Sequence, residues 1–495
     1  MLTRRDWLKA AASVSGAVLA GGCAAAGPRP ASAAPSAASG GDGPKRPNVL
    51  LIMADDATCS DLPLYGGPNV ATPHIDRLAR EGLTFNRAYL AEAMCQPCRA
   101  ELFTGLYPMR NGCCWNHSAS RPGTRSIVHH LGDLGHRVGI AGKVHVTPRG
   151  SYPFEMVGGV ERGCTSQTAK FDPAPLRDFM AAKGPFCLVV AITLPHMPWT
   201  VGDAGRFPKK DLRLPGYLVD TPEMREAFAD YLAEIAAMDA QVGGTLAALQ
   251  ETGREGDTLV LFTSEQGAQL PGCKWTTYEP GVRTALVARW PGRIRPGRRT
   301  DALVQYADVV PTLVEAAGGD PAGGHFDGTS FLPVLLGRSD THREYAYHMH
   351  NNVPEGPPYP VRSVRDGRYH YIRNLTPEAT FIEKHLMSQN HGRRYWTSWM
   401  RAAFDKPHAY RMIHRYMHRP AEELFDTRED PDELASLLDR HGPPRQGVAD
   451  GETIAAVKAR LSAELDRWMA DQKDPGAALD TAEALAASRR AAKGK

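Results

Sequence analysis

The sequence predicts an α/β protein in which a mostly parallel central sheet is covered by helices, followed by a smaller antiparallel α+β subdomain. Four apolar runs each end in polar residues, and a long amphipathic helix lies between the last two of them. Strands that alternate with helices form a mostly parallel sheet covered on both faces. A change to a hairpin-like pattern from about residue 350 predicts the subdomain.

The composition is that of a globular protein. The chain has 495 residues, of which 42% are hydrophobic and 23% charged. These fractions lie near the globular average, so neither disorder nor a polytopic membrane protein is indicated. The length suits one large domain with an appendage. The nine cysteines contain no pair of CxxC motifs, which argues against a structural zinc site, while disulfides stay open for an exported chain.

The N-terminus has the features of an export signal. The stretch "TRRDWLKAAASVSGAVLAGGC" contains Arg4 and Arg5, then Lys9, then an apolar run, which indicates a twin-arginine signal. The run is short and Gly-rich against the roughly 20 residues of a membrane span. The run ends at Cys23, and attachment of a lipid anchor to this cysteine is one alternative. We therefore expect residues 1–44 to be signal and linker, and the twin-arginine machinery to deliver the protein to the periplasm or cell surface.

The net charge gives no support to nucleic acid binding. Removal of the signal residues 1–22 lowers the formal net charge from +3 to +1, because Arg4, Arg5, Lys9 and Asp6 are lost. A protein without a global positive field does not attract polyanions as a whole. We expect no nucleic acid partner.

The first apolar run, "NVLLIMADD", predicts a buried parallel strand that ends in two carboxylates. The runs "HRVGIAGK", "PFCLVVAITLPH" and "DTLVLFTSEQG" repeat this pattern. Ligands of open α/β sheets bind at the carboxyl ends of the strands. Asp55 and Asp56, at the end of the first run, are therefore expected to open onto a ligand site.

The segment between the third and fourth runs predicts a long amphipathic helix. Its apolar residues recur at spacings of three and four: Phe228, Leu232, Ile235, Met238, Val242, Leu246 and Leu249. Beyond residue 350, "PVRSVRDGRYHYIRNL" predicts a hairpin around Asp366 and Gly367, which favour a tight turn. The segment "ETIAAVKARLSAELDRWMADQ" predicts an amphipathic helix near the C-terminus.

The stretch "CQPCR" holds two cysteines three positions apart. A CxxC motif can be a redox pair or half of a zinc site. A redox pair would lie in a small βαβ fold, and a zinc site would need another pair of cysteines, and the sequence has neither. With Cys95, Pro97 and Arg99 the stretch has the form CxPxR, and here the chain resembles the sulfatase family, a branch of the alkaline phosphatase superfamily. Cys98 then has no catalytic role.

The resemblance extends over nearly all of the chain after the signal. The stretches "RPNVLLIMADD", "ATPHIDRLAREGLTFNRAY", "GKVH", "LPHMPW", "CKWTTYEPGVRTAL" and "EELFDTREDPDEL" follow one another in the order of the family. The resemblance implies an alkaline-phosphatase-like fold. We expect a catalytic domain at 45–350 and the C-terminal subdomain at 351–495.

The resemblance also implies a modified residue and a metal. In this family the CxPxR cysteine, here Cys95, is oxidised to formylglycine (3-oxoalanine) by a formylglycine-generating enzyme, and the hydrated aldehyde attacks sulfur. Ca²⁺, or Mg²⁺, would be bound by oxygen ligands and lie against the modified residue. The implied metal site comprises Asp55, Asp56, Cys95, Glu265 and Gln266.

Glu265 and Gln266 depart from the family, which normally has Asp and then Asn or His at these positions. Each side chain here is one methylene longer. Because calcium accepts varied geometry, we expect both residues to ligate the metal, with water in place of one of them as the alternative.

The remaining matched residues are assigned catalytic roles by the resemblance. Arg99 would hold and activate the nucleophile, and Lys143 and Lys274 would bind the sulfate. His145 would remove a proton during sulfate release, and His196 would protonate the leaving group.

The substrate class is indicated by local sequence. "AGKVHVTPRGSYPFE" is closer to the heparan N-sulfatase (sulfamidase) branch than to arylsulfatases, so we expect a sulfate ester or sulfamate of a sulfated sugar, of the N-sulfoglucosamine type. The alternatives are an O-sulfatase or arylsulfatase, a phosphonate monoester or phosphodiester hydrolase of the same superfamily, and a non-catalytic binding protein. A homodimer is also left open.

Residues 391–420 form a basic segment. It carries seven Arg or Lys residues and four His residues against Asp405 alone, with aromatic residues between them. Such a segment suits anionic sugars, and Arg393 and Arg394 are the candidate substrate-binding residues. A solvated charged face with aromatic core residues is the alternative.

Overall fold

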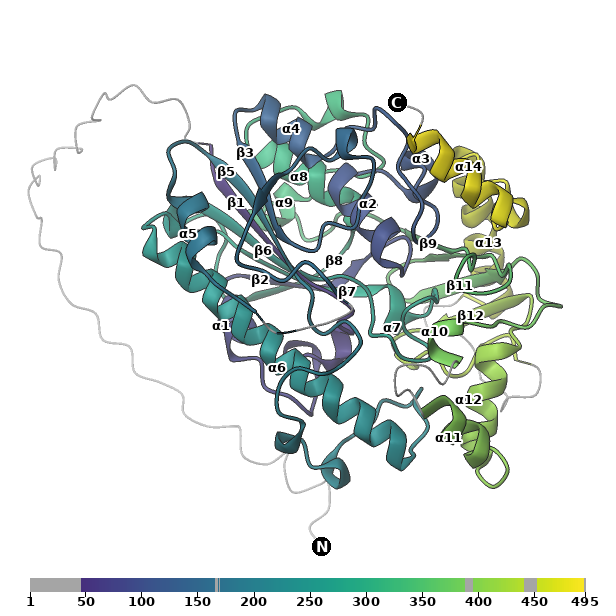
Figure 1. Ribbon diagram of the computed structural model, residues 1–495. Helices are drawn as coiled ribbons and strands as arrows, with labels where there is room; N and C mark the ends of the chain where they lie inside the picture. Colours follow the sequence, from purple (N-terminus) through teal and green to yellow (C-terminus); the bar gives the residue numbers. More distant parts are fainter. Residues whose placement is uncertain (1–45, 165–167, 169, 388–394, 440–451, 494–495) are drawn as a thin grey trace, which may run out of the picture. The chain divides into compact units, whose positions relative to one another are not determined.

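The four apolar runs predicted as buried strands all belong to one sheet, which lies at the centre of Figure 1. The computed structural model describes residues 46–164, 168, 170–387, 395–439 and 452–493. Within these residues the sheet has eight strands in the order β4-β3-β5-β1-β6-β7-β2-β8. Their bounds are β1 Asn48–Ala54, β2 Leu83–Tyr89, β3 Arg137–Gly142, β4 Glu155–Val157, β5 Phe186–Ile192, β6 Thr258–Ser264, β7 Arg283–Arg289 and β8 Arg298–Gln305.

Most neighbouring strands of this sheet are parallel. β1 pairs in parallel with β5 and β6, β3 with β4 and β5, and β2 with β8. Only β7 among the described strands of this sheet runs antiparallel to its neighbours, β6 and β2. The mostly parallel sheet predicted from the sequence is confirmed, and β1, β3, β5 and β6 all end at the same edge.

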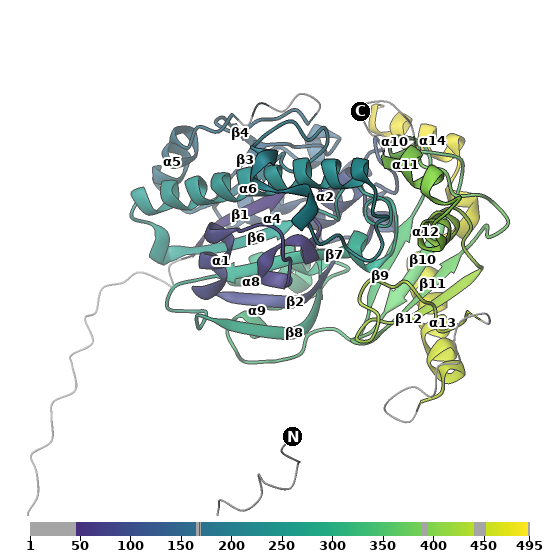
Figure 2. The same ribbon diagram turned by 90° about the horizontal axis from the view of Figure 1, so that it is seen from below.

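Helices cover both faces of the sheet, as the two views in Figures 1 and 2 show. Leu50 and Ile52 of β1 pack in one core with α1, α5 and α6, whereas Val49, Leu51 and Met53 pack in a second core with α2, α4, α8 and α9. Because both faces of the strand are buried, its sequence is continuously apolar rather than alternating. These helices are α1 Pro73–Arg80, α2 Cys95–Thr104, α4 Ile127–Asp133, α5 Ala174–Ala181, α6 Pro222–Glu251, α8 Val309–Ala316 and α9 Leu332–Leu335.

The long amphipathic helix predicted before β6 is confirmed as α6, and all seven of its periodic apolar residues are buried. Its start is encoded locally. The Thr221 hydroxyl accepts a hydrogen bond from the Met224 backbone N–H at 3.1 Å, and Pro222 occupies the first helical position.

A second, four-stranded antiparallel sheet lies beyond residue 345, in the order β12-β11-β10-β9 within the described residues. One of its faces packs on the predicted C-terminal helix, where the rings of Tyr347 and Trp468 stack at 5.1 Å. The antiparallel α+β part of the prediction is confirmed. The elements here are β9 Ala346–His350, β10 Val361–Arg365, β11 Tyr369–Asn374, β12 Glu422–Asp426, α10 Lys384–Met387, α11 Tyr395–Ala402, α12 Pro407–Met417, α13 Ile454–Asp471 and α14 Ala482–Lys493.

The predicted hairpin around Asp366 is confirmed as the β10–β11 pair. The Asp366 carboxylate accepts hydrogen bonds from the backbone N–H groups of Arg368 and Tyr369, both at 2.7 Å. An aspartate that bonds the backbone two residues ahead closes such turns. The turn is therefore encoded by its own sequence.

Residues 46–495 form one compact unit. The boundary at residue 350 stays a prediction, and the predicted signal and linker, with Cys23, lie outside the described residues. In the part of the chain that the structure describes, no helix combines the length and hydrophobicity of a membrane span. All eight cysteines described are free thiols.

Candidate active site

Four side chains of the candidate site meet where β1 and β6 end. The two strands are parallel neighbours with Ala54 opposite Ser264, and the Glu265 N–H donates to the Ala54 carbonyl at 2.7 Å. Asp55 and Asp56 follow β1, and Glu265 and Gln266 follow β6. All four are completely buried. The strand pairing thus brings together four of the five residues that the sequence predicted for the metal site.

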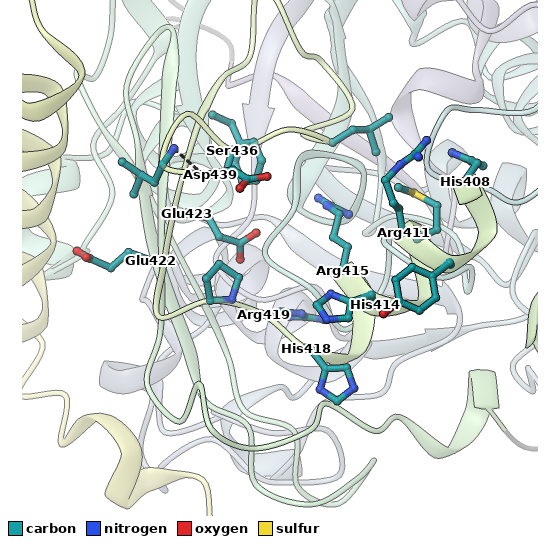
Figure 3. A pocket seen from close by; sticks show the side chains of 16 residues that line it. His408, Arg411, His414, Arg415, His418, Arg419, Glu422, Glu423, Ser436 and Asp439 are labelled. Atoms are coloured by element: carbon teal, nitrogen blue, oxygen red, sulfur yellow. Dashed lines mark hydrogen bonds between the residues drawn. The ribbon is translucent and has the colours of Figure 1, made fainter. Parts of the chain in front are cut away.

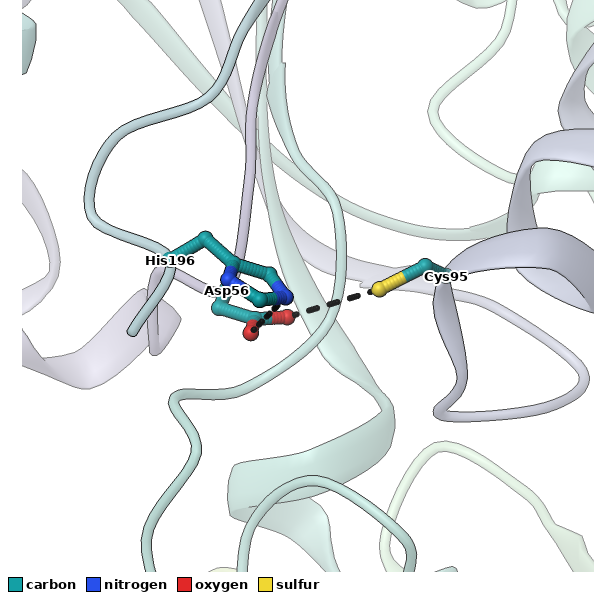
Figure 4. A group of neighbouring side chains, drawn as sticks. All are labelled: Asp56, Cys95 and His196. Carbon is teal, nitrogen blue, oxygen red and sulfur yellow. Dashed lines mark hydrogen bonds and ion pairs between the residues drawn. The ribbon is translucent and has the colours of Figure 1, made fainter. Parts of the chain in front are cut away.

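Cys95 reaches this group as the first residue of α2. Its Sγ lies 3.8 Å from Asp55 Oδ1 and 3.9 Å from Asp56 Oδ1, and Figure 4 shows the thiol pointing at the Asp56 carboxylate. Lys274 Nζ lies 3.1 Å from the same sulfur. Cys98, by contrast, is fully buried in the core between α2 and the sheet, so the two cysteines of the motif have separate surroundings.

Three cations alternate with the carboxylates. Arg99 Nε lies 2.5 Å from Glu265 Oε1, Lys143 Nζ lies 2.5 Å from Asp55 Oδ2, and Lys274 Nζ lies 2.7 Å from Asp56 Oδ2. A buried charge is tolerated when it is paired in this way. Burial alone would raise the pKa of Asp55, but the Lys143 ammonium and other nearby groups hold it well below its usual range. Burial raises the pKa of Glu265 well above its usual range, and the neighbouring Asp55 adds to the rise.

Lys143 is placed by a glycine that no other residue could replace without a shift of the backbone. Gly142 ends β3 with φ of +92°, and a Cβ atom there would lie 2.1 Å from the Ala191 carbonyl oxygen. The Arg99 guanidinium also donates to the Lys143 carbonyl at 2.7 Å. The short motif "GKVH" therefore encodes both the strand end and the residue that follows it.

Two histidines complete the predicted set. His196 Nε2 lies 3.6 Å from Asp56 Oδ2 (Figure 4), and its Nδ1 lies 2.5 Å from the Met197 carbonyl oxygen. The ring of His145 lies 5.4 Å from that of His117. Burial, together with the charges of Lys143 and Arg99, lowers the pKa of His145 well below its usual value, so this imidazole is neutral at pH 7.

Backbone strain is concentrated around these residues. Asp56, His117, His145 and Trp275 all have left-handed φ angles, of 56°, 58°, 43° and 64°. Such conformations cost about 1–3 kcal/mol each and often mark functional sites. His117 and Trp275 were not among the predicted site residues. Trp275 directly follows Lys274 in a matched stretch and could have been found there, whereas nothing around His117 in the sequence marks it.

The donor set fits a hard divalent cation. Oxygen or sulfur atoms of Asp55, Asp56, Cys95 and Glu265 lie within 4.8 Å of one another. Gln266 Oε1 is buried beside them without a hydrogen-bond partner among the described residues, while the amide nitrogen contacts Asp56, Glu265 and Cys95. Carboxylate and amide oxygens are ligands that Ca²⁺ and Mg²⁺ prefer.

The described part of the basic segment is divided between core and surface. Tyr395, Trp396 and Trp399 of α11 are buried in the core, as the alternative interpretation held, whereas Arg411 and Arg415 of α12 line a pocket of about 810 Å³. Figure 3 shows this pocket between α12, β12 and the residues after β12, and it shares no residue with the candidate active site. Arg393 and Arg394 lie outside the described residues.

Comparison with known proteins assigns the family. Residues 47–319, more than half of the chain, match the family model for sulfatases. The chain belongs to the sulfatase family. A second match, to the C-terminal model of N-sulphoglucosamine sulphohydrolase over residues 273–383, places this sulfatase near the sulfamidase branch. Both parts of the predicted resemblance are confirmed, and the protein is a hydrolase of sulfate esters or sulfamates.

Its relatives include an ulvan-active sulfatase and N-sulphoglucosamine sulphohydrolase. This sulfatase is 31% identical to an ulvan-active sulfatase of Formosa agariphila, over 87% of its own chain and 81% of the relative. It is 28% identical to human N-sulphoglucosamine sulphohydrolase, over 86% and 91% of the two chains. A solved structure in complex with D-glucosamine-2-N,6-O-disulfate superposes with a TM-score of 0.65 at 19% identity, covering 87% of this chain and 99% of that one. That likeness confirms the alkaline-phosphatase-like fold.

Proposed function

We propose that this sulfatase hydrolyses the sulfate ester or sulfamate of a sulfated carbohydrate, with N-sulfoglucosamine groups as its preferred substrate. The observation that carries the proposal is the arrangement around Cys95 Sγ, where buried carboxylates alternate with Arg99, Lys143 and Lys274. The match to the C-terminal model of N-sulphoglucosamine sulphohydrolase supports the sulfamate preference.

Two groups that the family implies fit the residues present. A formylglycine at position 95 would supply, in its hydrated form, a hydroxyl nucleophile for sulfur and a second hydroxyl through which sulfate is released. A Ca²⁺ ion held by Asp55, Asp56, Glu265 and the Gln266 carboxamide oxygen would supply positive charge to the sulfuryl oxygens.

The lysines bind and orient the sulfate. Lys274 Nζ already contacts the sulfur atom of Cys95, and Lys143 Nζ reaches Asp55, which itself contacts that sulfur. Ammonium groups aimed at a reacting centre stabilise negative charge on the non-bridging oxygens as the transition state forms. Arg99 acts as a positioning residue, because it ties Glu265 to the backbone of Lys143.

The two histidines move protons. His196 is hydrogen-bonded through Nδ1 and presents Nε2 toward Asp56, so Nε2 is the atom that donates a proton to the departing nitrogen or oxygen. His145 is neutral at pH 7 because its pKa is lowered, so it can accept a proton during sulfate release.

Mass spectrometry and kinetics together test this proposal. The peptide containing Cys95, from protein made in its native host, should carry the aldehyde, and kcat/KM should be higher for N-sulfoglucosamine than for glucosamine 6-O-sulfate. Cys95→Ala should lower kcat by at least about 10⁴-fold. An unmodified cysteine in fully active protein would overturn the mechanism, and faster turnover of a phosphate diester than of any sulfate would overturn the substrate class.

The cellular part of the proposal rests on the sequence alone. Export through the twin-arginine machinery, a periplasmic or cell-surface location and a lipid at Cys23 concern residues 1–45, which lie outside the described part of the chain. Modification of Cys95 by a formylglycine-generating enzyme stays a prediction, and so does the formation of a homodimer.

A further inference from the structure

A row of side chains leads from the catalytic group to the short helix α10. Lys274 Nζ, which contacts Cys95, lies 5.0 Å from the centre of the Trp275 ring. The His385 imidazole stacks on that indole, with ring centres 5.5 Å apart and planes 14° from parallel. Trp275 is buried, whereas His385 is 40% exposed. The row therefore ends at a half-exposed imidazole, separated from the lysine by the Trp275 ring.

His385 contacts the buried carboxylate of Glu355, which several other donors also contact. Glu355 is 1% exposed, and its oxygens lie 2.5 Å from His385 Nε2, 3.4 Å from Lys384 Nζ and 3.0 Å from Asn116 Nδ2. Burial would raise the pKa of Glu355, but the hydrogen bond and charge of His385, with Asn116 and Lys384, lower it to about 2. The carboxylate is therefore ionised and holds these side chains in place.

His117, the residue after Asn116, connects this cluster back to the catalytic group. His117 is exposed, its left-handed backbone is fastened by the Arg489 guanidinium, which donates to its carbonyl at 2.7 Å, and its ring lies 5.4 Å from that of His145. The other acidic residue of the cluster, Glu383, is fully buried, and its carboxylate accepts from the backbone N–H groups of His385 and Leu386.

The exposed side chains of this cluster are thus nitrogen bases, while its carboxylates are buried. Lys384 is 52% exposed and donates from Nζ to the Pro354 carbonyl at 2.7 Å, and with His117 and His385 it gives the cluster three accessible nitrogen-bearing side chains. The Lys384 ammonium offers charge-assisted hydrogen bonds to an anion, and burial lowers the pKa of His117, so its neutral imidazole offers an ordinary N–H donor. Neutral hydroxyl groups would gain much less from the same side chains.

We propose that Lys384, His385 and His117 bind a second anionic substituent, a carboxylate or a further sulfate, of the sugar whose scissile sulfate lies at Cys95. The inference rests on the proposed function and narrows its substrate range, because such a site would favour doubly charged saccharides over singly charged ones.

Binding measurements that need no turnover test this inference. Full-length Cys95→Ala protein is titrated by calorimetry with N-sulfoglucosamine, with glucosamine N,6-O-disulfate, and with a disaccharide in which a hexuronate precedes N-sulfoglucosamine. At least one of the two doubly anionic probes should bind about ten-fold more tightly than N-sulfoglucosamine. The probe that gains identifies the anion as sulfate or carboxylate.

The variant for this test is Lys384→Gln with His385→Gln, in the same background. Glutamine at position 385 keeps an N–H donor facing Glu355, so the buried carboxylate is not left unpaired. We expect the preference for the doubly anionic probe to disappear, while Lys183→Ala, an exposed lysine elsewhere, retains it. Equal affinity for all three probes, or a preference that survives the double substitution, would overturn the inference.

The outcomes separate this inference from the proposed function. If modified wild-type protein hydrolyses none of the sugars but the binding preference is present, the proposed function fails and the binding site remains. If the protein hydrolyses N-sulfoglucosamine and shows no preference in binding, the function holds and the second anion site does not. In active protein the double substitution should raise KM for the doubly anionic sugar more than it lowers kcat.

Discussion

The two residues that depart from the family, Glu265 and Gln266, occupy the centre of the charge arrangement. Glu265 reaches both Arg99 and the group of atoms that fit a metal, and Gln266 contacts Asp56 and Cys95 through its amide. The polar groups of Glu265 and Gln266 therefore still lie at the site, although each side chain is one methylene longer than in the family. This supports the expectation that both remain ligands, which stays a prediction.

Substitution of Glu265 should weaken metal binding. Glu265→Gln replaces one of three buried carboxyl groups with an amide, so the Kd for Ca²⁺ should rise by roughly 10–100-fold, because calcium affinity follows the charge and geometry of its ligands. Glu265→Asp, which keeps the charge, should lose much less. Calorimetric titration of metal-stripped protein measures both, with the exposed Glu251→Gln as control. Wild-type affinity in Glu265→Gln would remove this residue from the metal site.

At the scale of the elements, the loop that carries His196 is held by the neighbouring helix α6. The loop after β5 carries His196, and farther along it the Thr200 and Val201 N–H groups donate to Glu234 of α6, at 2.7 and 3.1 Å. Glu234 is completely buried, and burial raises its pKa to about 8. A buried carboxyl group on α6, with a raised pKa, thus anchors the loop that carries His196.

Glu234 should make the stability of the protein depend on pH. Its folded pKa of about 8 lies above the ordinary value of 4.5, so the folded state keeps a proton that the unfolded chain releases. The stabilisation is fully present below about pH 4.5 and is lost as the pH rises toward 8, at up to roughly 1.4 kcal/mol per pH unit. Glutamine does not titrate, so Glu234→Gln should lose less stability than wild type over this range.

Urea unfolding at about pH 5 and about pH 8 measures the difference. The matched control is Glu226→Gln, an exposed glutamate on the same helix, which should follow the wild-type pH dependence. Parallel pH dependence in wild type and Glu234→Gln would show that the buried carboxyl group does not carry this effect.

The strands and long helices were the elements that local sequence could predict. The run from Asn48 to Ala54 is apolar throughout because both of its faces are buried, and α6 has a clear helical period with its own cap. Their secondary structure follows from short-range pattern. Strand order does not, because the apolar runs alone do not say that β7 separates β6 from β2.

At the scale of the whole molecule, the site combines the large sheet with residues from the far end of the chain. The candidate site comes from the ends of β1, β3, β5 and β6 and the start of α2. Glu355 comes from the segment between β9 and β10, and α10 from the segment between β11 and β12. A substrate larger than the reacting group would therefore contact both parts.

The basic segment should contribute to binding of long substrates. Neutralising Arg393 and Arg394 together should raise KM for a sulfated oligosaccharide several-fold more than KM for a small aryl sulfate, because only the longer anion would reach beyond the catalytic group. Steady-state kinetics with both substrates measure the effect, with Arg428→Ala as a surface control. Equal changes in the two KM values would assign the segment to the solvated surface.

The sequence by itself determined the family, the CxPxR motif at Cys95 and the residues that gather at the strand ends, because motif order and apolar runs are local properties of the chain. It did not reveal His117, nor the contact of Asn116 and His385 with Glu355, since these residues are far apart along the chain and none belongs to a recognisable motif. Only the tertiary structure decided that they border the site. Chain folding brings residue 116 beside residue 355, and the burial of Glu355 makes that contact energetically significant because an ionised carboxylate in the interior must be paired.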